Sequence, residues 1–189
     1  MQIRNANGEL LDYSYQTSEN RKDSDWLFIV GHGVTGNKDR PIVKAAAKAI
    51  SEIGYDTLVF SFSGNGHSEG HFQDSNITKE VDDLGSVLDA FAKRKIAYIG
   101  HSMGAAVGVI KAASDQRIQL LVSLAGMVDT RKFAQTEFGD AKPDQDLMWE
   151  ERGCPLSSSF MTDLCETVVS VTKTARKIDI PWLLLHGSA

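Results

Sequence analysis

The sequence predicts an α/β fold in which a mainly parallel sheet is flanked by helices. Short apolar runs, typical of strands buried on both faces, alternate with segments whose apolar residues recur at helical spacing. This alternation indicates successive β-α-β units, which place their strands parallel in one sheet. The 189 residues are enough to enclose one hydrophobic core.

The expected strands and helices follow one another along the chain. An edge strand is expected at 9–15, after a turn at Asn7-Gly8, because apolar and polar residues alternate there. Buried strands are expected at 26–30, 57–62, 96–99, 118–124 and 182–185. Helices are expected at 41–53, 77–91 and 103–113.

Residues at the helix ends support these assignments. Pro41 suits the first turn of the first helix, and Gly54 suits its C-terminal end. Asp74 or Ser75 is expected to cap the N-terminus of the second helix. The third helix is rich in small residues, which indicates that it packs closely on the sheet.

The stretch between the last two expected strands is too long for one crossover. We expect residues 1–126 to form the N-terminal part of the core, residues 127–178 a cap inserted over the C-terminal edge of the sheet, and residues 179–189 a further core strand. One helix of the cap is expected to have an apolar face made by Met161, Leu164, Val168 and Val171. The alternative is a single crossover helix with a long loop.

The charge and composition of the chain limit the molecules that it is expected to bind. A net charge of -5 and an isoelectric point near 5.5 argue against nucleic acid and anionic membranes as partners, since both select basic patches. The N-terminus has no apolar signal segment and no apolar run could span a bilayer, so a cytoplasmic protein is expected. Cys154 and Cys165 lack metal-ligand spacing and are expected to be reduced thiols, with a disulfide between them as the alternative.

The pentapeptide at 100–104, Gly-His-Ser-Met-Gly, is the strongest functional signal. It directly follows a buried strand and opens a helix, which is the setting of a nucleophile elbow. The glycines permit a sharp turn, and the N-terminus of the helix favours developing negative charge. Ser102 is therefore the candidate nucleophile. The alternative is a serine that caps an ordinary crossover helix.

A second glycine-rich turn, at 31–36 (GHGVTG), follows the strand at 26–30. Such a turn lets backbone N–H groups face the same crevice as the nucleophile. In an acyl-transfer site one oxyanion donor comes from the residue after the nucleophile and another from this loop. We therefore assign the two donors to the backbone N–H groups of Met103 and Val34.

With these motifs, the chain resembles the α/β-hydrolase superfamily, within its serine esterases, lipases and aminopeptidase-like hydrolases that carry an HGxxG loop. The matching stretches are WLFIVGHGVTGNK, LVFSFSGNGHSEG, IAYIGHSMGAAVG and PWLLLHGSA, and they cover nearly the whole chain in order and spacing. The motifs and the length of the insertion are most similar to cinnamoyl/feruloyl esterase-like members. A serine at the elbow argues against the dehalogenases and epoxide hydrolases, which use an aspartate there.

The chain departs from the family pattern at three internal positions. Asn65 stands at the usual histidine, Ser61 at the usual aspartate and Ala105 at a usual glycine. These changes are expected to alter local hydrogen bonding rather than the chemistry.

A larger departure concerns the catalytic acid and base. The family pattern after the strand at 182–185 is His-Gly-x-x-Asp, and here residues 186–189 (HGSA) fill its first four places. The resemblance therefore places the triad aspartate and histidine, with a last strand and helix, beyond Ala189. The stretch alone is expected to be poorly active, because a serine hydroxyl without a base is a weak nucleophile.

The five histidines of the chain are weak substitutes for that base. The resemblance gives His32 and His186 structural positions, and His101 is expected to point away from the reacting hydroxyl. An approach of His67 or His71 to Ser102 is the alternative, oriented by Glu69, Asp74 or Asp129.

These observations predict a serine hydrolase of small-molecule carboxylic esters that needs no metal or organic cofactor. Thioester and amide substrates stay open. Several large apolar residues of the cap are candidates, and some of them are expected to line an acyl or aryl pocket: Phe133, Phe138, Met148, Trp149, Phe160 and Met161. For each residue taken singly, packing in the core is the favoured role. The alternative function is a non-catalytic binding or scaffold protein with the same fold.

Overall fold

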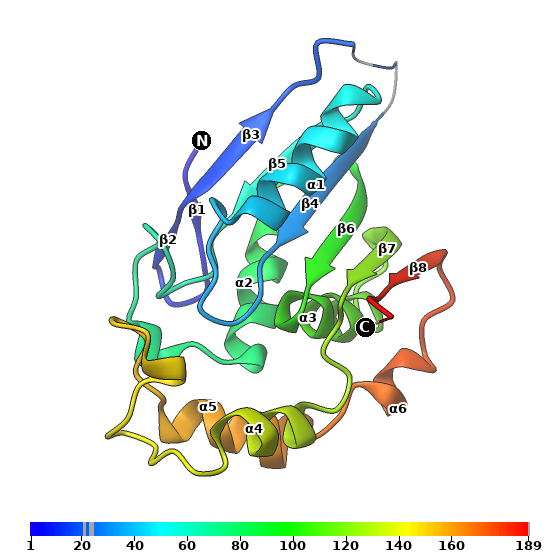
Figure 1. Cartoon of the computed structure of the whole chain (residues 1–189). Helices are drawn as coiled ribbons and strands as arrows, with labels where there is room; N and C mark the ends of the chain where they lie inside the picture. The colour runs from blue at the N-terminus through cyan, green and yellow to red at the C-terminus, as the bar shows by residue number, and fades with distance from the viewer. Residues whose placement is uncertain (21, 23–24, 189) are drawn as a thin grey trace.

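The computed structural model describes residues 1–20, 22 and 25–188, so Ala189 lies outside the described residues. Within this part, one sheet has the strand order β3-β5-β4-β6-β7-β8 (Figure 1). Only the pair β3–β5 is antiparallel. The predicted mainly parallel sheet is therefore confirmed. Its strands are β3 (Tyr13–Gln16), β4 (Trp26–Gly31), β5 (Asp56–Phe60), β6 (Lys95–His101), β7 (Ile118–Leu124) and β8 (Trp182–Leu185).

Helices cover both faces of the sheet. α1 (Pro41–Glu52) packs on β4 and β5, while α3 (Met103–Ala112) packs on β6 and β7 on the other face and α2 (Ile77–Ala90) lies against α3 (Figure 1). The apolar residues accordingly form a smaller cluster under α1 and a larger cluster under α2 and α3. Pro41 begins α1, as the sequence predicts.

The N-terminal cap of α2 differs from the expectation. Asn76, rather than Asp74 or Ser75, is the capping residue, and its side chain accepts a hydrogen bond from the Lys79 N–H (2.8 Å). Ser75 is buried and its hydroxyl contacts Glu80 and Asn65 instead. The pattern of capping residues could not distinguish three adjacent side chains that all accept such bonds.

The expected edge strand at 9–15 is two strands. β1 (Ile3–Arg4) and β2 (Leu10–Leu11) form a separate hairpin around the predicted turn at Asn7-Gly8, and only β3 joins the main sheet. The break falls at Asp12, whose N–H donates to the Ser68 hydroxyl (2.8 Å) and whose C=O accepts from the Ser61 N–H (2.9 Å).

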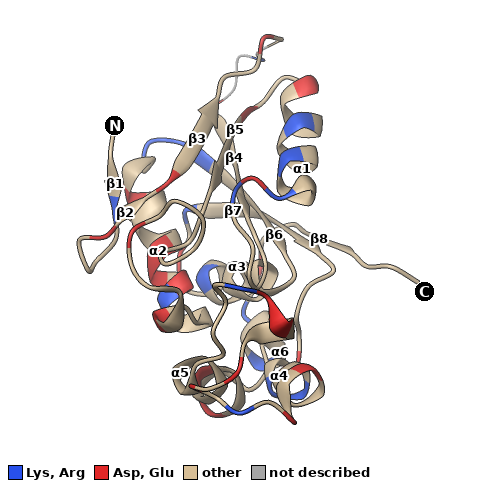
Figure 2. Ribbon diagram, turned by 60° about the vertical axis from the view of Figure 1, so that its left-hand side comes forward, with Lys and Arg blue, Asp and Glu red and all other residues tan. Residues whose placement is uncertain are grey.

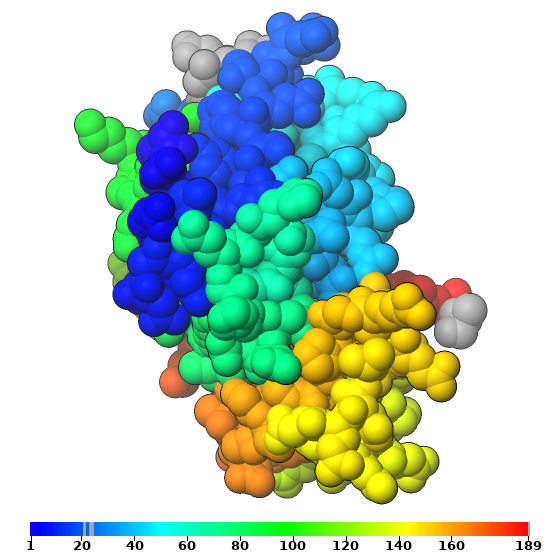
Figure 3. All heavy atoms as spheres, turned by 90° about the vertical axis from the view of Figure 1, so that its left-hand side faces the viewer, coloured from blue at the N-terminus to red at the C-terminus, as the bar shows by residue number. Residues whose placement is uncertain are grey.

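Residues 127–178, here called the insert, lie at the C-terminal ends of the parallel strands (Figure 1). They contain α4 (Thr130–Phe138), α5 (Ser158–Thr162), α6 (Thr172–Ala175) and the short turns η2 (Met148–Glu150) and η3 (Asp163–Val168). Figure 3 shows the yellow and orange part of the insert packed against the teal segment that leads into α2, where α5 and η3 contact η1 (Phe72–Asp74) and α2.

The prediction of one continuous helix near the end of the insert is wrong, because several short elements stand there. Leu164 and Val171 are buried as the pattern predicts, but the backbone turns at Val169 (φ 60) between η3 and α6. A β-branched residue at positive φ cannot continue a helix. The apolar face is therefore divided: Met161 lies in α5, Leu164 and Val168 lie in η3, and Val171 lies just before α6.

The charged residues of both signs are interspersed over the helices in Figure 2. Among the described residues, no helix combines the length and the apolar character needed to cross a membrane.

Candidate active site

Ser102 occupies a strained turn between β6 and α3. Its φ of 52 and ψ of -116 are unfavourable for a residue with a side chain, and such a conformation typically costs about 1–3 kcal/mol. The backbone holds the turn from both sides, because the Ser102 N–H donates to the Leu124 C=O (3.0 Å) and the Ser102 C=O accepts from the Met127 N–H (3.1 Å). The turn places Ser102 at the N-terminus of α3, where the helix dipole favours negative charge.

Two glycines allow the loop after β4 to lie directly against this turn. A Cβ atom on Gly33 would lie 2.8 Å from the Cβ of Ser102, and one on Gly104 would lie 2.3 Å from the backbone oxygen of His32. Both distances are shorter than real contacts allow. The two glycine-rich motifs therefore pack backbone against backbone.

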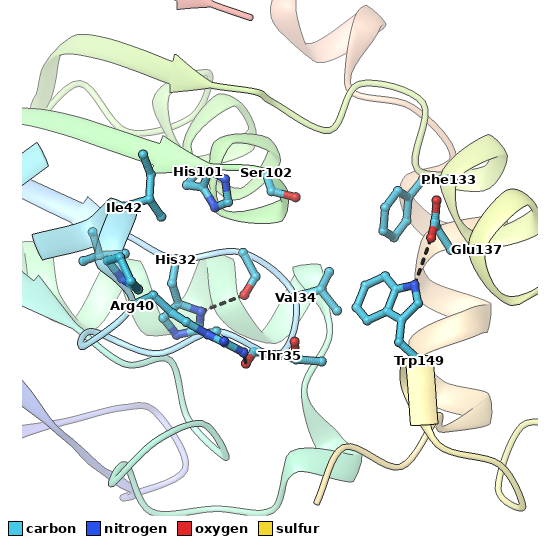
Figure 4. Close-up of a pocket in the computed structure, with 14 residues that line it drawn as sticks. His32, Val34, Thr35, Arg40, Ile42, His101, Ser102, Phe133, Glu137 and Trp149 are labelled. Carbon is cyan, nitrogen blue, oxygen red and sulfur yellow. Dashed lines mark hydrogen bonds between the residues drawn. The ribbon is translucent and has the colours of Figure 1, made fainter. Parts of the chain in front are cut away.

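Ser102 opens into a pocket of about 690 Å³ between this loop and the insert. In Figure 4 its hydroxyl points into the space between Val34 and Phe133. Phe133 and Trp149 of the insert form the opposite wall, with ring centroids 6.3 Å apart, and the Trp149 indole N–H donates to Glu137 (2.9 Å). The pocket thus has an aromatic wall facing a half-buried serine.

The other apolar candidates of the insert do not line this pocket. Phe138, Met148 and Phe160 are buried in the main core, and Met161 packs against it. Of the predicted acyl-pocket residues, the structure brings Phe133 and Trp149 to Ser102.

The two backbone N–H groups assigned to an oxyanion are without a protein acceptor. Val34 is half-buried and lines the pocket, and Met103 is the first residue of α3, where intrahelical acceptors are missing. In the described part of the chain, neither N–H donates a hydrogen bond to a protein group. Their role stays a prediction.

His32 is a buried, neutral residue that shapes the loop. Its Nε2 accepts from the Phe62 N–H (3.1 Å), so the ring proton is on Nδ1, which donates to the Gly33 C=O (2.9 Å). Burial lowers the pKa of His32 to about 4. Both ring nitrogens are therefore occupied, which leaves His32 unsuited to act as a base.

The remaining histidines are not placed as bases either. His101 lines the pocket, and burial lowers its pKa, but in Figure 4 its ring points away from the Ser102 hydroxyl. His67 and His71 are exposed and do not line the pocket, and His186 borders a separate apolar cavity between α3, α6 and β8. Among the described residues, no histidine forms a hydrogen bond with Ser102.

Two of the three carboxylates considered as partners for His67 or His71 have other contacts. Glu69 accepts from the Arg4 guanidinium (3.1 Å) and the Leu10 N–H (2.8 Å), and Asp129 caps α4.

The sequence model of the alpha/beta hydrolase fold matches residues 27–151. The chain belongs to this family. The match includes Ser102 with its elbow, the loop at 31–36 and the first part of the insert.

Solved structures agree with the assignment. The chain is similar to Est1E from Butyrivibrio proteoclasticus, solved with ferulic acid bound, with a TM-score of 0.86 and 26% identity over 99% of this chain and 78% of that chain. It also resembles the esterase Pf2001 from Pyrococcus furiosus, with a TM-score of 0.69 and 24% identity over 97% of this chain and 68% of that chain.

One curated relative matches part of the sequence. It is an uncharacterized 31.7 kDa Escherichia coli protein encoded in the traX-finO intergenic region, 28% identical over 109 residues. The match covers 54% of this chain and 38% of the relative, so the chain spans well under two thirds of that relative's length.

Sequence reasoning missed two charged residues that line the pocket beside Ser102. Glu137 comes from the exposed face of α4, and Arg40 directly precedes α1. Nothing in the spacing of Glu137 indicates its place. Arg40 could have been noticed because it joins the predicted loop to a predicted helix start.

Two of the residues that depart from the family pattern, Asn65 and Ser61, form local hydrogen bonds. The amide of Asn65 donates to the Ser63 C=O (3.2 Å) and the Ser75 hydroxyl (3.1 Å), and the Ser61 hydroxyl accepts from the Lys38 N–H (3.1 Å). These contacts hold the loop after β5 and tie it to the segment before α1.

The described residues contain no group of three or more His, Cys, Asp or Glu side chains arranged to hold a metal ion. Cys154 is buried and Cys165 half-buried, and both are free thiols.

Proposed function

We propose that this protein is a serine hydrolase of carboxylic esters that acts through an acyl-enzyme on Ser102. The observation that carries the proposal is the strained turn of Ser102, which lets this serine line a pocket together with Val34. In the described part of the chain, the N–H groups of Val34 and Met103 have no protein acceptor. Strain is expected where the surrounding fold holds a residue for chemistry. The family assignment and the similarity to Est1E support a hydrolytic, esterase-like activity.

In the proposed reaction the Ser102 Oγ attacks the acyl carbon while a base takes its proton. The N–H groups of Val34 and Met103 stabilise the resulting oxyanion, and each such donor is typically worth about 3 kcal/mol of barrier. The positive end of α3 adds to this stabilisation. The alcohol then leaves with a proton, and water attacks the acyl-enzyme to release the acid and regenerate the Ser102 hydroxyl.

The base and its carboxylate are proposed to come from residues that follow Ala189 in the native protein. No described histidine reaches Ser102, and the family pattern places the aspartate directly after residues 186–189. The coding sequence downstream of Ala189 tests this. An aspartate codon at the next position and a histidine further on support the proposal, while a stop codon directly after Ala189 contradicts it.

An ester with an apolar or aromatic acyl group is the proposed substrate class, with the insert acting as a cap over it. Phe133 and Trp149 offer flat apolar faces opposite Ser102 (Figure 4). Est1E, whose structure contains the aromatic acid ferulic acid, supports this choice.

Labelling of the native gene product with a fluorophosphonate probe tests the mechanism. We expect covalent labelling of the wild-type protein and its loss in Ser102→Ala, together with at least a thousandfold loss of p-nitrophenyl ester hydrolysis, on the order expected for removing a nucleophile. Ser114→Ala is the matched control, because this exposed serine lies at the far end of α3. Equal labelling of wild-type and Ser102→Ala protein would favour the non-catalytic alternative.

A further inference from the structure

The loop between β4 and α1 depends on one residue in an unfavourable conformation. Thr35 has φ 53, in the left-handed region that a β-branched residue rarely adopts. A single turn bond from the Gly36 N–H to the Gly33 C=O (2.9 Å) closes the backbone around it. Thr35 directly follows Val34. A change in the backbone dihedral angles of Thr35 therefore also rotates the peptide groups beside the proposed oxyanion donor.

Arg40 reaches back onto this strained residue. Its Nη2 donates to the Thr35 C=O at 2.8 Å. The Arg40 backbone is fixed at the start of α1, because its N–H donates to the Asn37 C=O (3.2 Å) and its C=O accepts from the Lys44 N–H (3.1 Å). The guanidinium thus ties the loop to a rigid helix.

The same nitrogen of Arg40 also contacts the insert. It donates to Glu151 Oε1 at 3.3 Å, two residues after Trp149. Both side chains are more than two-fifths exposed, so the ion pair by itself contributes little to stability. Its consequence is geometric, because Glu151 keeps the guanidinium over the Thr35 carbonyl.

We propose that Arg40 is a positioning residue for ester hydrolysis and that Glu151 couples it to the insert. The inference rests on the proposed function of Ser102. Arg40 holds Thr35 in the left-handed region, which keeps the Val34 N–H directed at the developing oxyanion. Glu151 belongs to the insert and orients Arg40 only when the insert is packed on the core. The insert also supplies the aromatic wall, so the Val34 N–H is fully aligned only when that wall is in place.

The first test compares Arg40→Met with Lys48→Met. Methionine keeps an unbranched apolar stem but removes every donor, while Lys48 is an exposed lysine in α1 that pairs with Glu52. We expect kcat for a p-nitrophenyl ester to fall about tenfold to a hundredfold in Arg40→Met with KM changed less than about threefold, since a small misplacement near the reacting atoms is costly. Lys48→Met is expected to match the wild type. A loss confined to KM, or no loss, overturns the inference.

A rescue by glycine separates positioning from a general structural effect. Glycine adopts positive φ without strain, so the loop needs Arg40 less in the Thr35→Gly background. The fall in kcat caused by Arg40→Met is expected to shrink to about threefold or less in that background. An equal fall in both backgrounds contradicts the proposed action through Thr35.

A double-mutant cycle of Glu151→Ala and Arg40→Met tests the coupling between Arg40 and the insert. Glu151→Ala is expected to lower kcat less than Arg40→Met, because the bond to Thr35 remains. It is expected to have no further effect once Arg40 is methionine, since it acts only through that side chain. Additive losses overturn the coupling.

Hydrogen exchange makes the inference testable independently of catalysis. The Gly36 amide, whose N–H donates to the Gly33 C=O, is expected to exchange faster in Arg40→Met than in Lys48→Met. If Ser102→Ala retains full labelling and activity, the proposed function fails, and the exchange rates alone then decide whether Arg40 holds the loop. Unchanged exchange overturns the inference whatever the activity.

Discussion

At the scale of single residues, the site is built from close approaches that only particular side chains permit. Ser102 has an unfavourable backbone, and the glycines around it let the loop after β4 lie against the elbow. The sequence made Ser102 and the glycine-rich loops recognisable, because a short motif between a strand and a helix has few structural solutions.

Gly104→Ala tests the close approach. The added methyl group would lie 2.3 Å from the backbone oxygen of His32, and neither backbone can move without disturbing the sheet. We expect the free energy of unfolding to fall by at least about 3 kcal/mol in urea titrations, at the upper end for overpacking. Gly187→Ala is the control, because nothing lies within 4 Å of its added atom. Equal stability of the two variants would show that the loop is not packed on the elbow.

His32 predicts a pH dependence of stability. Its folded pKa of about 4 lies below the ordinary value of 6.5, because the ring is buried. At pH values between these two, the His32 ring is protonated in the unfolded chain but neutral in the folded protein. The free energy of unfolding therefore falls as the pH is lowered through this range. The loss attributable to His32 is about 2.5 kcal/mol between pH 7 and pH 4.5.

Urea titrations of wild-type and His32→Gln protein at both pH values isolate this contribution. Burial raises the pKa of Glu80 and Asp83, so those carboxyl groups favour the folded state as the pH falls and oppose the trend. Subtracting the two proteins removes their effect. A ring pKa near 6.5 for His32 in an NMR titration of the wild type would contradict the assigned tautomer and burial.

At the scale of elements, the sequence predicted the parallel core well and the insert poorly. Buried strands such as β4 are continuous apolar runs, so the sequence alone placed this strand within one residue of its observed bounds. The insert instead depends on contacts between distant segments, such as the bond from Trp149 to Glu137. Positive φ at Trp149 and Val169 breaks its helices at places that periodicity does not reveal.

The aromatic wall predicts a selectivity that depends on the acyl group. Trp149→Ala removes the indole that packs beside Phe133 in the aromatic wall and breaks its bond to Glu137. We expect kcat/KM for an aromatic acyl ester to fall about tenfold and that for the acetyl ester to change less than about threefold, since only the larger group reaches the wall. Trp149→Phe keeps a flat ring and is expected to retain most of the selectivity. Equal losses for both esters would contradict the assignment of the wall to the acyl group.

At the scale of the whole molecule, the fold class was the most predictable property and the catalytic apparatus only partly so. The order of strands and motifs is set by local sequence, whereas the placement of Arg40 and Glu151 side by side joins residues 111 positions apart. The arrangement also leaves β8 at the edge of the sheet, with Leu183, Leu184 and Leu185 at least half exposed.

This edge predicts self-association of the 189-residue chain. An exposed apolar edge strand offers unpaired backbone groups to a second copy, and a charged side chain on the strand opposes such pairing. Leu183 is 52% exposed and Ile53, at the end of α1 away from this edge, is 55% exposed, so lysine at the two positions changes charge and apolar area equally. Sedimentation velocity over a range of concentrations is expected to show association of the wild type and of Ile53→Lys, with about tenfold weaker association of Leu183→Lys. If Ile53→Lys weakens association as much as Leu183→Lys does, general surface hydrophobicity rather than the edge of β8 drives it.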